Sequence, residues 1–170
     1  MKNLKSALLL MLCLFLTSAS LHAQSLQKKL APKQTVKPAP AFSLVALDGS
    51  PVNLKAYDGK VVILDFWATW CPPCRAEIPH FVALQKKYAG KVQVVGISLD
   101  DDAKPVHPFI KEQGINYPIA MGDEDIVKAF GGIQGIPTTF VIDKKRRIVA
   151  KFVGYQDLST FEKTLAPLLK

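Results

Sequence analysis

The pair Cys71 and Cys74 constrains this chain more than any other feature of its 170 residues. Residues 61–66 come just before the pair and form an apolar run, broken only by Asp65, that is typical of a buried strand. From Pro72 onward the spacing of apolar residues predicts a helix. Two thiols in a Cys-x-x-Cys pair allow one to attack a disulfide while the other resolves the mixed disulfide. The pattern therefore predicts thiol–disulfide exchange at a strand-to-helix junction.

The N-terminus has the features of an export signal. Lys2 and Lys5 make a positive start, and residues 7–16 form an apolar stretch that is short for a membrane span. Small residues lead to Ala23, so we predict a secretory signal peptide over residues 1–23. Export would place the chain in the periplasm, where disulfides persist. The alternative is an uncleaved signal that tethers the protein to the membrane.

Composition separates a basic N-terminal part from a nearly neutral remainder. Residues 24–40 are rich in lysine, glutamine and proline, and we expect a flexible linker there. The formal net charge is +8, but all 14 acidic residues lie within residues 41–170, which form the predicted domain. The domain has no basic stripe interleaved with aromatic residues. This argues against a nucleic-acid partner.

Residues 41–170 alternate between patterns for strands and for helices, which indicates an α/β fold class. A four-residue turn joins the last two strands, so they must be antiparallel, and we expect a mixed sheet with helices on both faces. A turn at Asp48 and Gly49 predicts an N-terminal β-hairpin. The strands are expected at 61–66, 92–99, 117–120, 138–142 and 147–152, and the helices at 72–88, 105–113, 123–130 and 157–168.

The two cysteines receive different roles from their positions. Cys71 would lie at the helix N-terminus, where unpaired N–H groups and the helix dipole stabilise a thiolate, so we assign it as the nucleophile. Cys74 lies one turn further on and is assigned as the resolving thiol. Pro72 and Pro73 suit a helix start but remove two N–H donors, which should make Cys71 less acidic. No second Cys or His pair has zinc-site spacing, so we expect no metal and no cofactor beyond the Cys71–Cys74 disulfide.

Two carboxyl groups near the pair are candidate catalytic groups. Asp65 interrupts an apolar strand, and burial would raise its pKa, so that it could relay the proton that Cys74 loses. The alternative is a structural Asp satisfied by hydrogen bonds at the strand end. Glu77 follows Cys74 by three residues on the same helix face. It would tune the thiols or carry a proton; the alternative is a solvated surface Glu.

The candidate substrate-binding residues flank the pair. Trp70 directly precedes Cys71 and would either cover the disulfide or offer an apolar docking surface. We group Pro72 with Trp70 on that surface. A proline at the start of a strand, Pro137, cannot donate to a sheet ladder, which indicates an edge or a special peptide bond.

Residues 64–79 and 135–143 together resemble the TlpA/ResA branch of thioredoxin-like proteins, and the similarity runs from about Phe42 to the C-terminus. The resemblance implies a thioredoxin-like fold with an N-terminal hairpin and a central insertion at residues 100–130. It implies an exported thiol–disulfide reductase that acts on protein disulfides, as in cytochrome c maturation. It also implies a membrane electron donor of the thiol-carrier type.

The resemblance carries roles for three residues and leaves three departures. It implies a cis proline at Pro137, backbone hydrogen bonds from Ile136 to an extended substrate, and an active-site role for Glu77. Asp65 stands where this branch often has Asn, and residues 94–98 contain no lysine to partner it. In the last hairpin turn, Arg146 stands where the branch usually has glycine, which predicts a longer or strained turn.

Two other functions remain open, and a third is disfavoured. The same dithiol could act as an oxidant, since the couples of this fold span a wide range of potentials. A copper-binding or copper-delivery module would use the two thiolates with Met121 or His107 as a further ligand. A peroxidase would need a lone activated cysteine, and the paired motif argues against it.

Overall fold

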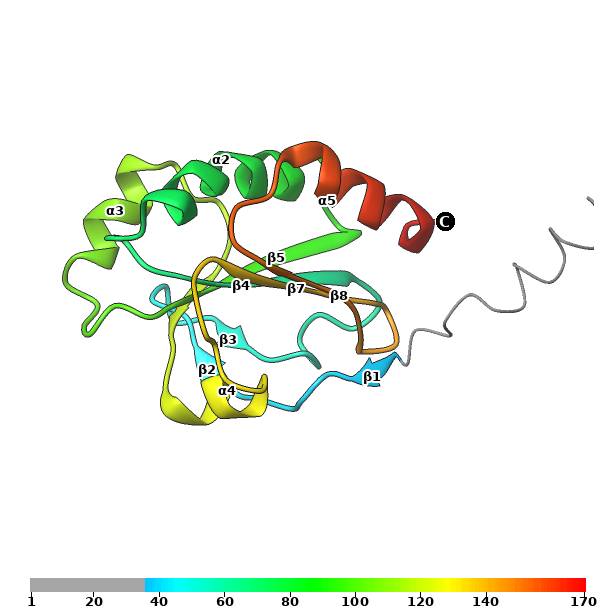
Figure 1. Cartoon of the computed structure of the whole chain (residues 1–170), viewed down its shortest axis with the longest axis horizontal. Helices are drawn as coiled ribbons and strands as arrows, with labels where there is room; N and C mark the ends of the chain where they lie inside the picture. The colour runs from blue at the N-terminus through cyan, green and yellow to red at the C-terminus, as the bar shows by residue number, and fades with distance from the viewer. Residues whose placement is uncertain (1–35) are drawn as a thin grey trace, which may run out of the picture. The chain divides into compact units, whose positions relative to one another are not determined.

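A six-stranded mixed sheet forms the centre of the computed structural model, which describes residues 36–170 (Figure 1). The strand order is β1-β8-β7-β4-β5-β6, and β2 and β3 form a separate hairpin. The strands are β1 (Lys37–Pro38), β2 (Leu44–Val45), β3 (Pro51–Val52), β4 (Val61–Trp67), β5 (Val92–Ser98), β6 (Ile119–Met121), β7 (Thr138–Ile142) and β8 (Arg147–Val153). The helices are α2 (Pro72–Lys87), α3 (Val106–Glu112), α4 (Glu124–Ala129) and α5 (Leu158–Leu165), with a 3₁₀ turn at Ala166–Leu168.

Strand β4 lies inside the sheet, parallel to β5 and antiparallel to β7. All seven of its residues are buried because both faces of the sheet are covered. Figure 1 shows α2, α3 and α5 on one face and α4 with the hairpin on the other. Since side chains alternate along a strand, Ile63 and Trp67 pack beneath α2 while Leu64 and Phe66 enter the opposite core. Asp65 therefore faces α2.

The buried side chains of helix α2 follow the same kind of periodicity. Its buried positions recur at intervals of three and four, which places Cys74 and Glu77 on one face with the apolar side chains that pack on the sheet. The apolar members of that face are Ile78, Phe81 and Leu84. The helix continues through Pro79.

The predicted fold class is confirmed. The β2–β3 hairpin, the antiparallel β7–β8 pair and helices on both faces are all present. Residues 100–130, the expected insertion, contain α3, β6 and α4, and β6 extends the sheet by pairing parallel to β5.

The folded domain begins earlier than residue 41, where we expected it to begin. Lys37 and Pro38 form β1 at the sheet edge, and the N–H of Ala39 donates to the carbonyl of Arg146 at 2.8 Å. Composition indicated a linker, but an edge strand pairs through its backbone, and an edge tolerates a proline. The predicted signal peptide over residues 1–23 and the first part of the linker lie outside the described residues. Within residues 36–170, no helix has the length and apolarity needed to cross a bilayer.

The turn between β7 and β8 is strained at one residue, as the sequence predicted. Arg146 has φ of +57°, a conformation that glycine adopts more readily. Its guanidinium binds both carboxylate oxygens of Asp58, at 2.8 and 2.6 Å. Asp143 accepts the N–H groups of Lys145 and Arg147, at 2.9 Å each, and so closes the turn.

Candidate functional site

The two cysteines form a disulfide at the start of α2. The S–S distance is 2.06 Å and the Cα atoms are 5.3 Å apart. Cys71 is the N-cap of α2, as expected for the nucleophile, and Cys74 lies one turn into the helix. Both are nearly buried, with 3% of Cys71 and 1% of Cys74 exposed.

The sulfur of Cys71 receives one N–H donor from the first turn of the helix. Pro72 and Pro73 occupy the first two helical positions and have no N–H. The first available N–H belongs to Cys74, and it donates to Cys71 Sγ at 3.3 Å. In the reduced protein this single donor would stabilise a Cys71 thiolate less than a full set of N–H groups would.

Asp65 is buried beneath α2, as predicted, with 3% of the residue exposed. It lies opposite Thr139 in the β4–β7 register, and the Thr139 hydroxyl donates to Asp65 Oδ1 at 3.0 Å. Burial raises the pKa of Asp65 well above its ordinary value. The charge of Glu77 raises this pKa further, and the hydrogen bond from Thr139 opposes the rise.

Glu77 is fully buried, not a solvated surface residue. Its Oε1 accepts the backbone N–H of Gln156 at 2.7 Å, whereas its Oε2 has no hydrogen-bond partner. Burial raises the pKa of Glu77 to about 7, and the N–H of Gln156 and the Thr139 hydroxyl oppose this rise. The two carboxyl groups are thus brought together in the core.

A glycine occupies the β5 position from which a lysine could pair with Asp65. Gly96 lies directly opposite Asp65 in β5. A Cβ atom at Gly96 would lie 2.8 Å from Trp67 Nε1 and would clash with Ile119 Cδ1. The indole of Trp67 therefore fills this space, and its buried N–H has no partner. A lysine cannot enter from this position.

The predicted substrate-binding residues form the rim of the disulfide. Trp70 is 66% exposed and Pro72 is also exposed, so the indole presents an apolar surface to solvent. The Ile136–Pro137 peptide bond is cis, as the resemblance implied. The carbonyl oxygen of Ile136 lies 3.7 Å from Cys71 Sγ. Trp70, although next to Cys71 in the chain, does not bury its ring over the core.

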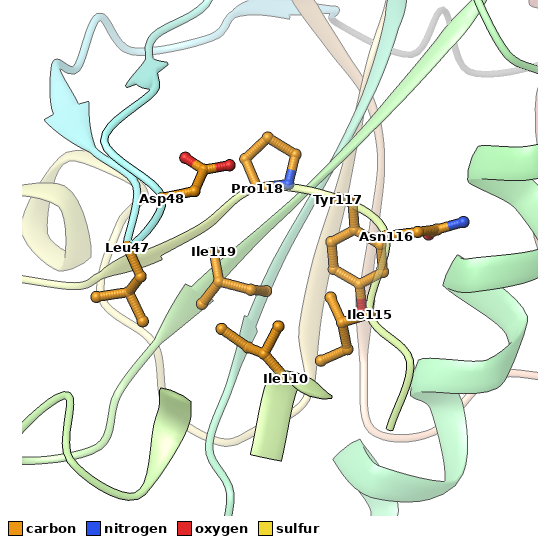
Figure 2. A pocket seen from close by; sticks show the side chains of 8 residues that line it. All are labelled: Leu47, Asp48, Ile110, Ile115, Asn116, Tyr117, Pro118 and Ile119. Carbon is orange, nitrogen blue, oxygen red and sulfur yellow. The ribbon is translucent and has the colours of Figure 1, made fainter. Parts of the chain in front are cut away.

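A separate pocket of about 210 Å³ lies at the edge of β6 (Figure 2). It is lined by none of the predicted site residues. Tyr117 lines it, packing edge-on against Phe81 of α2. Burial raises the pKa of Tyr117 well above its usual range, and the charges of Asp65 and Glu77 raise it further. The other residues that line the pocket are Leu47, Asp48, Ile110, Ile115, Asn116, Pro118 and Ile119.

Sequence reasoning missed a buried aspartate that holds the loop before the disulfide. Asp100 accepts the Thr69 N–H at 3.0 Å, the Thr69 hydroxyl at 2.6 Å and the Ser98 hydroxyl at 2.7 Å. Thr69 lies two residues before Cys71, so these bonds fix the approach of the chain to the helix. The signal available in the sequence was the position of Asp100 just after a buried strand.

Two further partners of the site were also missed. Thr139 follows Pro137 by two residues, and the strand alternation could have placed it on the Asp65 face. Gln156 acts through its backbone N–H, for which side-chain patterns give no signal. Among residues 36–170 there is no group of three or more His, Cys, Asp or Glu side chains able to hold a metal ion.

Comparisons with known proteins point to one family. The family model described as Redoxin matches residues 34–165. The chain is 34% identical over 130 residues to a thiol-disulfide oxidoreductase ResA of Bacillus thuringiensis (strain Al Hakam), covering 76% of this chain and 75% of that protein. It is 34% identical over 168 residues to the thioredoxin-like protein YneN of Bacillus subtilis (strain 168), covering 97% and 98%. A crystal structure of a thiol:disulfide interchange protein from Chlorobium tepidum TLS matches with a TM-score of 0.75 and 38% identity, covering 81% of this chain and 99% of that one.

Proposed function

Because the chain belongs to the Redoxin family and is a thiol–disulfide oxidoreductase with a thioredoxin-like fold, we propose that it works as a reductase of disulfides in exported proteins. The periplasm is the proposed compartment, reached through the predicted signal peptide over residues 1–23. An uncleaved signal would instead tether the same domain to the membrane. Cytochrome c maturation is the proposed setting.

One observation carries the direction of the reaction: a single N–H, that of Cys74, reaches Cys71 Sγ. An oxidising couple is one whose reduced form is stabilised, above all by stabilising the nucleophilic thiolate. Pro72 and Pro73 withhold two donors from that thiolate. The buried carboxyl groups of Asp65 and Glu77 add negative charge nearby whenever they ionise, and negative charge also disfavours a thiolate. These features support a reducing couple.

The proposed reaction transfers two electrons from the dithiol to the substrate. The Cys71 thiolate attacks one sulfur of the substrate disulfide, that S–S bond breaks, and a mixed disulfide forms. Cys74 then gives its proton to a buried carboxylate, Asp65 or Glu77, and its thiolate attacks Cys71 Sγ. The bond between Cys71 and the substrate breaks, and the two substrate sulfurs, each released as a thiolate, take their protons from water. A membrane donor of the thiol-carrier type would return the Cys71–Cys74 disulfide to the dithiol.

The rim of the disulfide supports binding of an extended protein segment. Trp70 and Pro72 offer exposed apolar surface beside Cys71. The carbonyl oxygen of Ile136, the residue before Pro137, lies 3.7 Å from Cys71 Sγ. We propose that the substrate segment lies between these two sides and forms backbone hydrogen bonds with Ile136.

Two measurements test this function. Equilibration of the mature protein in graded thiol buffers should give a potential nearer to thioredoxin, at about −270 mV, than to strong dithiol oxidants, at about −120 mV. A potential at the oxidant end would favour the dithiol oxidant instead. Tight stoichiometric copper binding by the reduced protein, without disulfide reduction, would favour the copper module.

The second measurement concerns the substrate. A Cys74→Ser variant should accumulate mixed disulfides between Cys71 and exported proteins in cells. The matched control is the Cys71→Ser, Cys74→Ser double variant, which should accumulate none. Equal recovery from both variants would contradict protein substrates.

A further inference from the structure

Two carboxyl groups and one hydroxyl meet between β4, α2 and β7. Asp65 and Glu77 are buried, and Thr139 lies close to both. The Thr139 hydroxyl has one hydrogen, which it donates to Asp65 Oδ1 at 3.0 Å. Glu77 Oε2 is left without a partner. A buried carboxylate oxygen without a donor is costly, so this arrangement needs an explanation.

A proton on Glu77 removes the difficulty. A protonated Glu77 Oε2 can donate to Thr139 Oγ1 while the Thr139 hydroxyl donates to an ionised Asp65. The reverse arrangement has the proton on Asp65, which then donates to Thr139 Oγ1 while the hydroxyl turns toward Glu77. Each arrangement satisfies all three groups with one proton. Two neighbouring buried carboxylates would repel each other if both were ionised.

We propose that Asp65, Thr139 and Glu77 form a proton-sharing chain that stores one proton, and that Thr139 is the positioning residue that passes it between the two carboxyl groups. The proposal deepens the function above and rests on it for its role in the reaction. It assigns to Thr139 a part in handling the Cys74 proton.

Few groups around Asp65 and Glu77 can offset their negative charge, so the shared proton is its main compensation. None of the salt bridges between residues 36–170 includes Asp65 or Glu77. From the loop after β8, the Gln156 N–H binds Glu77 Oε1, and the Gln156 carbonyl lies 3.2 Å from His80 Nδ1. Tyr117 is buried within range of both carboxyl charges. Cys74 lies one turn before Glu77 on α2.

The proton-sharing chain of Asp65, Thr139 and Glu77 fits the proton balance of the resolving step. With one carboxyl group ionised, the chain can accept the proton that the Cys74 thiol releases, after which the thiolate attacks Cys71 Sγ. The chain then holds two protons and no charge. When the donor later reduces the disulfide, the chain returns one proton to the Cys74 thiolate and keeps one.

The test compares Thr139→Val, which removes only the hydroxyl, with Thr139→Ser, which keeps it. Carbon-13 NMR of the two side-chain carboxyl carbons in the oxidised protein, titrated from acid to alkaline pH, should show both signals moving at both steps. The serine variant should behave like the wild type. The valine variant should raise the first step by about one pH unit or more, and each carbon should then move mainly at its own step.

The functional readout is the pH profile of the resolving step. At neutral pH the valine variant should resolve a preformed mixed disulfide at least about tenfold more slowly than the wild type, and the serine variant should stay within about threefold. An unchanged titration in the valine variant would overturn the proposal. So would independent titration of the two carbons in the wild type.

The titration of the oxidised protein needs no substrate. The titration can therefore contradict proton sharing without bearing on whether the protein is a reductase. If the valine variant does not fold, the serine variant and the wild-type titration still decide the proposal.

Discussion

Glu77 Oε1 accepts the backbone N–H of Gln156 at 2.7 Å, across 79 positions of the sequence. This bond ties α2, which carries the disulfide, to the loop between β8 and α5. It also keeps a carboxyl group in the core, where burial raises its pKa to about 7. Glu77 is thus both a structural contact and a group that titrates near neutral pH.

The first prediction concerns the pH dependence of stability. Because the pKa of Glu77 is about 7 in the folded protein and near 4.5 in the unfolded chain, the folded state binds more protons between these values. The free energy of unfolding should therefore fall as pH rises from 4.5 through 7, by on the order of 3 kcal/mol from this group. Glu77→Gln should remove this fall, since glutamine does not ionise.

Urea unfolding of the oxidised protein at a series of pH values measures this effect. The control is Glu124→Gln, because Glu124 is exposed at the start of α4 and pairs only with Lys128. It should leave the wild-type pH profile unchanged. Equal pH profiles for the wild type and Glu77→Gln would contradict the role given to Glu77.

The second prediction concerns the clamp on the loop before the disulfide. Asp100→Asn replaces one acceptor oxygen by a donor, so the Thr69 and Ser98 donors cannot all be satisfied. We expect a loss of about 1–3 kcal/mol in stability and faster amide hydrogen exchange at Thr69. Asp101→Asn, at the exposed neighbouring residue, is the control and should change neither. Slow exchange at Thr69 in the Asp100 variant would show that the loop is held by other contacts.

The third prediction concerns the left-handed residue in the β7–β8 turn. Both Arg146→Gly and Arg146→Ala remove the ion pair with Asp58, but only glycine adopts a φ of +57° without strain. The glycine variant should therefore be more stable than the alanine variant by about 1 kcal/mol in thermal or urea unfolding. The same two substitutions at Lys151, inside β8, should give the opposite order, because glycine weakens a strand interior. The same order at both sites would refute the explanation.

The fourth prediction concerns the glycine opposite Asp65. Gly96→Ala forces a Cβ atom against Trp67 and Ile119 and should destabilise the protein by about 1–3 kcal/mol. Adding Ile119→Val removes the clashing Cδ1 atom and should recover part of that loss, so the two changes should not be additive. Gly135→Ala is the control, since nothing lies within 4 Å of a Cβ there and its φ is not positive. Additive losses in the double variant would count against the clash.

Much of the fold could be predicted because its signals are local. The apolar run around Asp65 and the turn at Asp48 depend on residues close in sequence, and they correspond to β4 and the β2–β3 hairpin. The boundary near residue 40 was wrong because composition reports chain polarity, whereas β1 forms through backbone bonds to β8. A short, polar edge strand leaves no periodic pattern to detect.

The candidate site likewise has features that local sequence predicts and features that depend on tertiary contacts. The sequence by itself determined where the Cys71–Cys74 pair lies, at a strand-to-helix junction, because adjacent local patterns define that junction. Only the tertiary structure decided that Asp65 meets Thr139, 74 positions away, and that Glu77 is buried against Gln156 rather than solvated. Register and packing bring such partners together, and burial follows from packing, so no local pattern encodes the hydrogen bonds or the raised pKa values. The position of the disulfide can therefore be predicted from local sequence, whereas the contacts that raise the pKa values of Asp65 and Glu77 depend on the fold.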